Sequence, residues 1–154
     1  MLTLVAFVVA LGLLIAVHEY GHYRVAVACG VKVLRFSVGF GKPLLTWRKK
    51  GSPTEFVLGA LPLGGYVRML DEREAPVDAA ERHLAFNTPP LRSRALIVAA
   101  GPVANLLLAV ALYSVVNWTG VDEPQPVIGS PVAGSVAAQA GLQGGEWVAQ
   151  VSVD

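Results

Sequence analysis

Charged residues and cysteine are both scarce in this sequence. Charged residues make up 15% of its 154 residues and hydrophobic residues 54%, whereas an average soluble chain is about 25% charged. An ordinary soluble domain is therefore disfavoured. The single cysteine, Cys29, excludes an intrachain disulfide and cannot complete a cysteine-rich zinc site alone. We expect Cys29 to be a small buried residue near the end of a helix.

Lysine and arginine are absent before Arg24 and after Arg94, although the chain has twelve of them. The segment after Arg94 contains only acidic charges. Cations confined to one loop between two apolar segments follow the positive-inside pattern of membrane proteins. This pattern predicts that residues 24–94 are cytoplasmic and that the N-terminus and the residues after 118 lie across the membrane. The net charge of +1 predicts no nucleic-acid partner.

The first apolar segment, Leu2–Val17, has no charged residue but is shorter than the roughly 20 residues that a membrane span needs. A signal peptide is the alternative, yet no cationic segment precedes it and no small-residue cleavage site follows. The helical pattern instead continues through the ionisable residues 18–22 to about Cys29, with Gly30 as a C-terminal cap. Ionisable groups at membrane depth are costly and are candidates for function.

Residues 31–70 are predicted to form β-structure. The runs rich in β-branched and aromatic residues are Val31–Phe40, Thr54–Ala60 and Tyr66–Leu70. Glycine and proline are predicted to end or separate these runs, at Gly39, Gly41, Pro43, Pro62 and Gly64-Gly65. We expect a small antiparallel β element that is apolar enough to lie against the membrane. A charged loop over Asp71–Asn87 follows, with room for a short helix.

The second apolar segment, Ala95–Trp118, carries no charge. It is long enough to span a bilayer with some tilt, and its Gly101-Pro102 pair is tolerated where neighbouring helices satisfy the backbone. From Pro124 the composition becomes that of a water-compatible β-type region. The sequence predicts short strands in this region at Val127–Gly129 and Trp147–Val153, and a helix or turn over Ala133–Leu142. About thirty residues with two strands cannot bury a core, so we expect this domain to continue beyond Asp154 and the chain to be an N-terminal fragment.

His18, Glu19 and His22 form the most informative pattern in the chain. On a helix, residues four apart lie on one face, so both imidazoles can bind one ion, and imidazole is a common ligand of catalytic zinc. Zinc lowers the pKa of water, and Glu19 can take the proton as water attacks and later return it to the departing amine. The pattern predicts a Zn²⁺-dependent peptidase. Hydrogen bonding between helices by the same side chains is the alternative.

A catalytic zinc has three protein ligands, and this motif supplies two. His83 is the only other histidine, and we expect it at the surface of the charged loop. Asn105, in the second apolar segment, is a poor zinc ligand. The acidic residues of the loop are expected to form a solvated face; they are Asp71, Glu72 and Glu74. We therefore expect the third ligand beyond Asp154.

Five pieces of the sequence occur in a fixed order: Val17–His22, Phe36–Gly41, Leu61–Val67, Phe86-Asn87 and Ala100–Asn105. Together they resemble the bacterial site-2 intramembrane metalloproteases. The resemblance implies an α-helical, multi-pass integral protein of the bacterial inner (cytoplasmic) membrane. Its two transmembrane helices (1–29 and 95–118) flank a cytoplasmic membrane-associated β element (30–94). Residues 119–154 then resemble the start of a periplasmic PDZ-like domain, which this chain includes only in part.

The family resemblance implies a zinc metalloendopeptidase that cuts single-span membrane proteins, such as anti-sigma factors, within or near the lipid bilayer. By carry-over, His18 and His22 bind zinc and Glu19 is the catalytic acid/base. The family's third zinc ligand is an aspartate of a later spanning helix, so we expect this chain alone to be inactive.

The resemblance also implies that the β element receives substrate as an added extended strand, a mode that exposes the peptide bond. Gly64 and Gly65 would allow close backbone approach to the substrate, although an ordinary tight turn is an equal alternative. Asn105 is carried over as a polar group that contacts substrate near the site, with a helix-packing hydrogen bond as its alternative. A competing interpretation of the whole chain is a non-enzymatic membrane scaffold with a partner-binding PDZ-like segment. Such a scaffold has no need for a carboxylate between two histidines.

Overall fold

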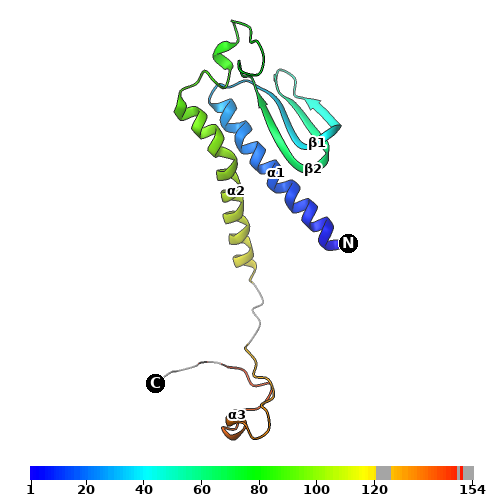
Figure 1. Ribbon diagram of the computed structural model, residues 1–154, viewed down its shortest axis with the longest axis vertical. Coiled ribbons are helices and arrows are strands. Elements are labelled where there is room, and N and C mark those ends of the chain that lie inside the picture. Colours follow the sequence, from blue (N-terminus) through cyan, green and yellow to red (C-terminus); the bar gives the residue numbers. More distant parts are fainter. Residues whose placement is uncertain (121–125, 149, 151–154) are drawn as a thin grey trace. The chain divides into compact units, whose positions relative to one another are not determined.

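The computed structural model describes residues 1–120, 126–148 and 150 (Figure 1). The chain divides into two compact units, Met1–Ser114 and Val115–Asp154. In chain order the elements are α1 (Leu2–Ala28), β1 (Val33–Arg48), β2 (Glu55–Met69), the 3-10 helix η1 (Arg82–Leu84), α2 (Leu91–Thr119) and α3 (Val136–Gln139). In the first unit, Figure 1 shows the sheet to the right of α1 and α2 to its left.

α1 ends where the sequence predicts. Cys29 is its C-cap, and Gly30 follows with φ +78°, a left-handed conformation that glycine adopts without steric strain. The Gly30 N–H donates to the Val27 carbonyl (3.1 Å) and the Val31 N–H to the Ala26 carbonyl (2.9 Å), which is the Schellman pattern. Cys29 is partly buried against the neighbouring core, close to the position predicted for it.

α1 and α2 are both long and apolar enough to cross a membrane, judged by length and composition. α2 starts at Leu91, earlier than the predicted span Ala95–Trp118, so Arg92 and Arg94 lie in its first turn. The helix thus extends one turn beyond the predicted apolar segment, at the end where the two arginines lie. A helix that leaves the apolar layer can keep its backbone hydrogen bonds while its cationic side chains reach the polar interface. The exposed surfaces of both helices are mostly large apolar side chains.

β1 and β2 form a two-stranded antiparallel sheet. Both strands run through the positions predicted as breaks, because the chain bends there without leaving the sheet. Gly39 bends β1 at φ +89°, and Pro43 lies in the segment 43–48 at the edge of the sheet, where a missing N–H is tolerated. The three short strands of the prediction are therefore wrong in their boundaries, although the antiparallel element is confirmed.

The bends allow parts of each strand to pair more than once. Residues 33–38 lie between 55–58 and 65–69, and residues 43–48 pair with 55–59 on the outer side. The two edges of the sheet are therefore 43–48 and 65–69. The second edge lies beside α1, where an added Cβ on Gly65 would meet Glu19 and Ile15.

Tyr23 of α1 anchors the helix to the sheet. Its ring contacts those of Phe36 and Phe56 edge-on, with centroids 5.8 and 5.6 Å apart. Such aromatic pairs contribute about 0.5–1.5 kcal/mol beyond the burial of area. Next to them lies a small buried core that joins the C-terminal end of α1, β1 and α2; its members are Ala26, Val31, Val33 and Ile97.

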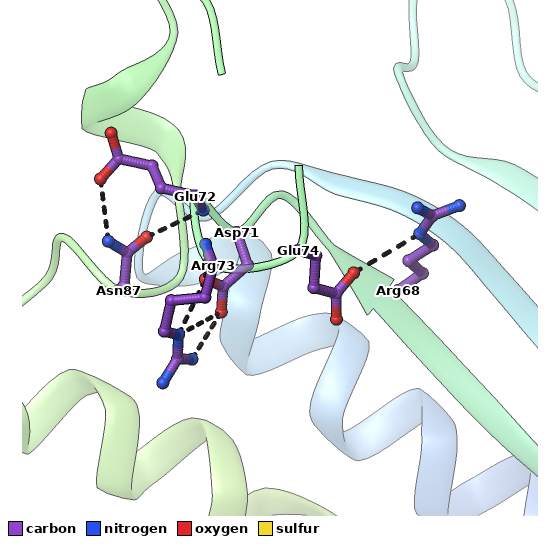
Figure 2. Close-up of polar contacts among 6 residues, drawn as sticks. All are labelled: Arg68, Asp71, Glu72, Arg73, Glu74 and Asn87. Atoms are coloured by element: carbon purple, nitrogen blue, oxygen red, sulfur yellow. Dashed lines mark hydrogen bonds and ion pairs between the residues drawn. The ribbon is translucent and has the colours of Figure 1, made fainter. Parts of the chain in front are cut away.

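The charged loop over residues 71–87 contains the short helix for which the sequence left room, η1. Figure 2 shows how the start of the loop is held in place. The Glu74 carboxylate lies 3.7 Å from the Arg68 guanidinium, and the Asn87 amide donates to Glu72 at 2.8 Å. Glu72 and Glu74 are exposed, as predicted for a solvated face.

The second unit has little regular structure among its described residues. α3 begins after Ser135, whose hydroxyl accepts a hydrogen bond from the Ala138 N–H at 3.2 Å, an ordinary N-cap. Val127 and Trp147 form an isolated bridge. The helix predicted within 133–142 is confirmed, whereas the predicted strand 147–153 falls partly outside the described residues. The PDZ-like domain stays a prediction.

Candidate metal centre

His18 and His22 lie one turn apart on the face of α1 that meets α2. Their Nε2 atoms are 3.1 Å apart and their ring centroids 4.8 Å apart. The two helices meet closely at Gly21, where an added Cβ would lie 2.5 Å from the Ala100 carbonyl oxygen and 2.8 Å from the Ala104 Cβ. Small residues permit this kind of backbone approach between membrane helices. The predicted ligand pair thus faces one point between the helices.

The backbone of α2 orients His22. Its Nδ1 atom lies 2.7 Å from the Ile97 carbonyl oxygen, and Ile97 is buried with 1% of its surface exposed. A carbonyl only accepts, so Nδ1 carries the proton and donates it to this oxygen. The lone pair of His22 is then on Nε2, the atom that faces His18. A metal-binding histidine is usually oriented in this way, by a hydrogen bond from the ring N–H that does not face the metal.

Gly101 of α2 provides the space in front of the two imidazoles. A Cβ added there would overlap the Nε2 atom of His22 and would lie 2.7 Å from that of His18. Every side chain larger than hydrogen would therefore occupy the point at which both Nε2 atoms aim. Sequence analysis treated the Gly101-Pro102 pair only as an interruption of a span. A glycine in a helix interior, where it lowers helix stability, was the signal that it has a packing role.

The donor set fits a zinc ion. Tetrahedral zinc with Zn–N distances of about 2.0–2.1 Å places two ligand nitrogens roughly 3.3 Å apart, close to the 3.1 Å between the Nε2 atoms of His18 and His22. Among the described residues, no group of three or more His, Cys, Asp or Glu side chains could hold a metal. His83 is exposed on η1, as predicted, and Asn105 presents an amide. The third ligand therefore stays a prediction.

Glu19 lies between two cavities. One, of about 380 Å³, also contains His22 and reaches the charged loop at Asp71 and Arg73. The other, of about 320 Å³, is lined by apolar residues of α1 together with Phe40, Gly64, Gly65 and others. The carboxylate can thus be reached from a polar side and from an apolar side of the unit.

Asp71 differs from the predicted solvated face. Its side chain is only 9% exposed and is paired with the Arg73 guanidinium at 2.5 Å, a contact drawn in Figure 2. The hydrogen bond from Arg73 lowers the pKa of the Asp71 carboxyl below its ordinary value. Asp71 therefore adds a fixed negative charge, neutralised by its neighbour, at the polar mouth of the larger cavity.

The three residues carried over as substrate contacts all line the smaller cavity. An added Cβ on Gly65 would lie 2.7 Å from Glu19 Cγ and 2.6 Å from the Ser37 carbonyl oxygen. Gly64 lies against the Phe40 ring in the same way. The Asn105 amide nitrogen lies 3.3 Å from His18 Nδ1. The structure therefore brings Gly65 and Asn105 to the residues of the zinc motif.

Comparison with known proteins identifies the family of this chain. Residues 6–145 match the model of peptidase family M50. The chain is 51% identical to the Ralstonia nicotianae protein named "Putative zinc metalloprotease RSc1411", covering 100% of this chain and 35% of that protein. It is 52% identical to the Regulator of sigma-E protease RseP of Escherichia coli, covering 92% of this chain and 31% of that protein. It is 51% identical to Protease RseP of Yersinia pestis, covering 93% of this chain and 32% of that protein.

Two helices apolar enough to cross a membrane, with a paired-histidine site that fits zinc, are features of the class of membrane metalloproteins. Within that class, the chain belongs to peptidase family M50, the site-2 proteases. The resemblance that the five sequence pieces indicated is thereby confirmed. The chain spans about a third of the length of the curated relatives it matches.

Proposed function

We infer that this chain forms part of the active site of a zinc metalloendopeptidase, supplying two zinc ligands and the catalytic carboxylate. The observation that carries this inference is the convergence of the His18 and His22 Nε2 atoms, 3.1 Å apart, on a point kept free by Gly101. A non-enzymatic scaffold would need neither the convergence nor the free space. Membership of family M50 supports the same conclusion.

Bound zinc would act as a Lewis acid toward the peptide carbonyl and water. His18 and His22 would hold it through Nε2, and the Ile97 carbonyl keeps the His22 ring in the tautomer that can do so. Glu19 lines both cavities beside the histidines. It accepts a proton from the attacking water and returns the proton to the departing amine. The third ligand is a carboxylate supplied from outside the described residues.

The substrates proposed are single-span membrane proteins of the anti-sigma-factor type, cut within or near the lipid bilayer of the bacterial inner membrane. The name of the Escherichia coli relative refers to sigma-E regulation. In the structure, the edge segment 65–69 lies beside α1 at Glu19. An extended peptide added to this edge would have its backbone exposed next to the carboxylate. Because Gly64 and Gly65 have no side chains, they would allow the sheet to stay close to the helix.

Zinc content decides between the protease and the scaffold. The complete protein that contains this chain would be purified in detergent and analysed for zinc, with His22→Ala and Gly12→Ala compared. Gly12 is a suitable control because an added Cβ there has nothing within 4 Å. We expect stoichiometric zinc in the natural protein and the control, and loss of zinc in His22→Ala. Equal zinc in all three would refute the proposal.

Glu19→Gln separates catalysis from metal binding. The amide cannot accept a proton, so peptide cleavage by the complete protein should fall by about 10²–10⁴-fold while zinc content stays unchanged. Cleavage of a single-span anti-sigma-factor substrate, followed by gel analysis, measures this. Undiminished cleavage would show that another group is the base.

A further inference from the structure

Asn105 has an unusual hydrogen-bonding environment for a polar side chain in an apolar helix. It lies on α2 one turn after Gly101, so both residues share the face that meets α1. Its amide nitrogen is 3.3 Å from His18 Nδ1. Its amide oxygen is buried and has no hydrogen-bond partner among the described residues. A buried acceptor without a donor is destabilising, which points to a role beyond helix packing.

Metal ligation by His18 defines what its other ring nitrogen needs. A neutral histidine that binds a metal through Nε2 carries its proton on Nδ1, and that N–H requires an acceptor. His22 has the Ile97 carbonyl for this purpose. For His18, the polar group within reach of Nδ1 is the Asn105 amide. The two ligands are therefore supported by different groups of the same helix, α2.

The orientation of the amide selects the tautomer of His18. With the amide nitrogen toward Nδ1, that nitrogen donates, so the His18 proton is on Nε2 and can be shared with His22 Nε2 at 3.1 Å. With the amide turned by half a rotation, the oxygen accepts from Nδ1–H and leaves the Nε2 lone pair available. The amide oxygen and nitrogen occupy nearly the same positions in these two orientations. The half rotation gives the oxygen a donor in His18 Nδ1–H, and it moves the amide nitrogen to the buried position where the oxygen had no partner.

We propose that Asn105 is a positioning residue of the metal centre, whose amide oxygen accepts the Nδ1 proton of His18 and so presents Nε2 to zinc. This inference rests on the proposed zinc site. It assigns Asn105 a role different from the substrate contact that the family resemblance implied. The Asn105 amide, 3.3 Å from His18 Nδ1, is well placed to interact with the histidine.

The test measures zinc affinity rather than proteolysis. The complete protein would be titrated against a zinc chelator in detergent, as the natural form and as Asn105→Leu, Asn105→Asp and Ser114→Ala. Leucine has the same branching but no acceptor, so zinc should bind about 10–100-fold more weakly. Aspartate only accepts, so Asn105→Asp should bind zinc at least as tightly as the natural form. Ser114 lies on the same helix and bonds only to its own turn, so Ser114→Ala should change nothing.

Cobalt substitution gives a second readout. The visible absorption of bound Co²⁺ reports ligand geometry, and it should change in Asn105→Leu but be restored in Asn105→Asp. Natural affinity in Asn105→Leu, or weak binding in Asn105→Asp, would overturn the inference. If Asn105→Leu does not fold, Asn105→Asp still decides, because a loss of affinity there contradicts an acceptor role. Absence of zinc from the natural protein would instead refute the zinc site itself, which distinguishes the two failures.

Discussion

The absence of a side chain at Gly101 is as important to the site as the presence of the two histidines. Imidazoles four residues apart on a helix can aim at one point, but a neighbouring helix in close contact would normally fill that point. Here the neighbouring helix places a glycine there, and an added Cβ would overlap His22 Nε2. The site is thus formed by both helices, although the two histidines and the carboxylate are on α1.

Gly101→Ala tests this directly. The methyl group would displace the imidazoles or the helix, so we expect zinc content of the complete protein to fall far below stoichiometric. Alanine favours helix by about 1 kcal/mol over glycine, so lower helix propensity cannot explain a loss. Metal analysis and circular dichroism measure the two effects. Gly12→Ala, with open space around it, is the matched control, and full zinc in Gly101→Ala would contradict the packing argument.

At the scale of elements, the contact between the sheet and α1 determines where Glu19 lies. Gly65 is on the edge segment of β2, and the space that its side chain would need is taken by Glu19 and Ile15. Its φ angle is not in the left-handed region, so alanine is disfavoured there by space alone. The sheet can therefore support the carboxylate only while this position is glycine.

Gly65→Ala should separate the sheet from α1 or move Glu19. Misplacement by about 1 Å can reduce catalysis on the order of 100-fold, so we expect that loss of cleavage rate. Zinc content should be unchanged, because the Nδ1 atoms of His18 and His22 lie at hydrogen-bond distance from groups of α2. Gly129→Ala, which has open space, serves as the control. Normal cleavage by Gly65→Ala would show that sheet and helix tolerate a larger separation.

The pairing of Asp71 with Arg73 makes the polar mouth of the larger cavity sensitive to acid. Hydrogen bonding from Arg73 lowers the pKa of the Asp71 carboxyl, so the folded loop favours the ionised form. Its contribution to the ordered loop is present above the ordinary aspartate pKa of about 3.9 and is lost as pH falls through the lowered value. Carbon NMR of labelled aspartate should show Asp71 titrating below that value. Arg73→Gln should raise the pKa toward normal, and an unchanged pKa would contradict the pairing.

At the scale of the whole molecule, the charge distribution predicts the orientation in the membrane. Every lysine and arginine lies between Arg24 and Arg94, so that segment should stay in the cytoplasm. A reporter fused after Glu74 should be cytoplasmic, and one fused after Asp122 should be exported. Alkaline phosphatase and green fluorescent protein fusions measure this, with expression levels as the control. The reverse pattern would refute the orientation.

Features that depend only on residues close to one another along the chain were predictable from the sequence. The end of α1 at Gly30 follows from local backbone geometry, and the two apolar helices follow from composition. The start of α2 and the course of β1 and β2 were not predictable in detail. Glycine and proline were taken as boundaries of the β runs, and they are tolerated where a strand bends and at a sheet edge, which are properties of the assembled fold.

The sequence by itself determined which side chains are available for chemistry: two imidazoles and a carboxylate at helical spacing, within an apolar segment. Only the tertiary structure decided how they are used. Gly101, the Ile97 carbonyl and Asn105 meet His18 and His22 across more than seventy residues of chain. The physical reason is that ligand identity is a property of side chains, whereas tautomer, free space and orientation arise from contacts between helices, which spacing along one helix does not encode.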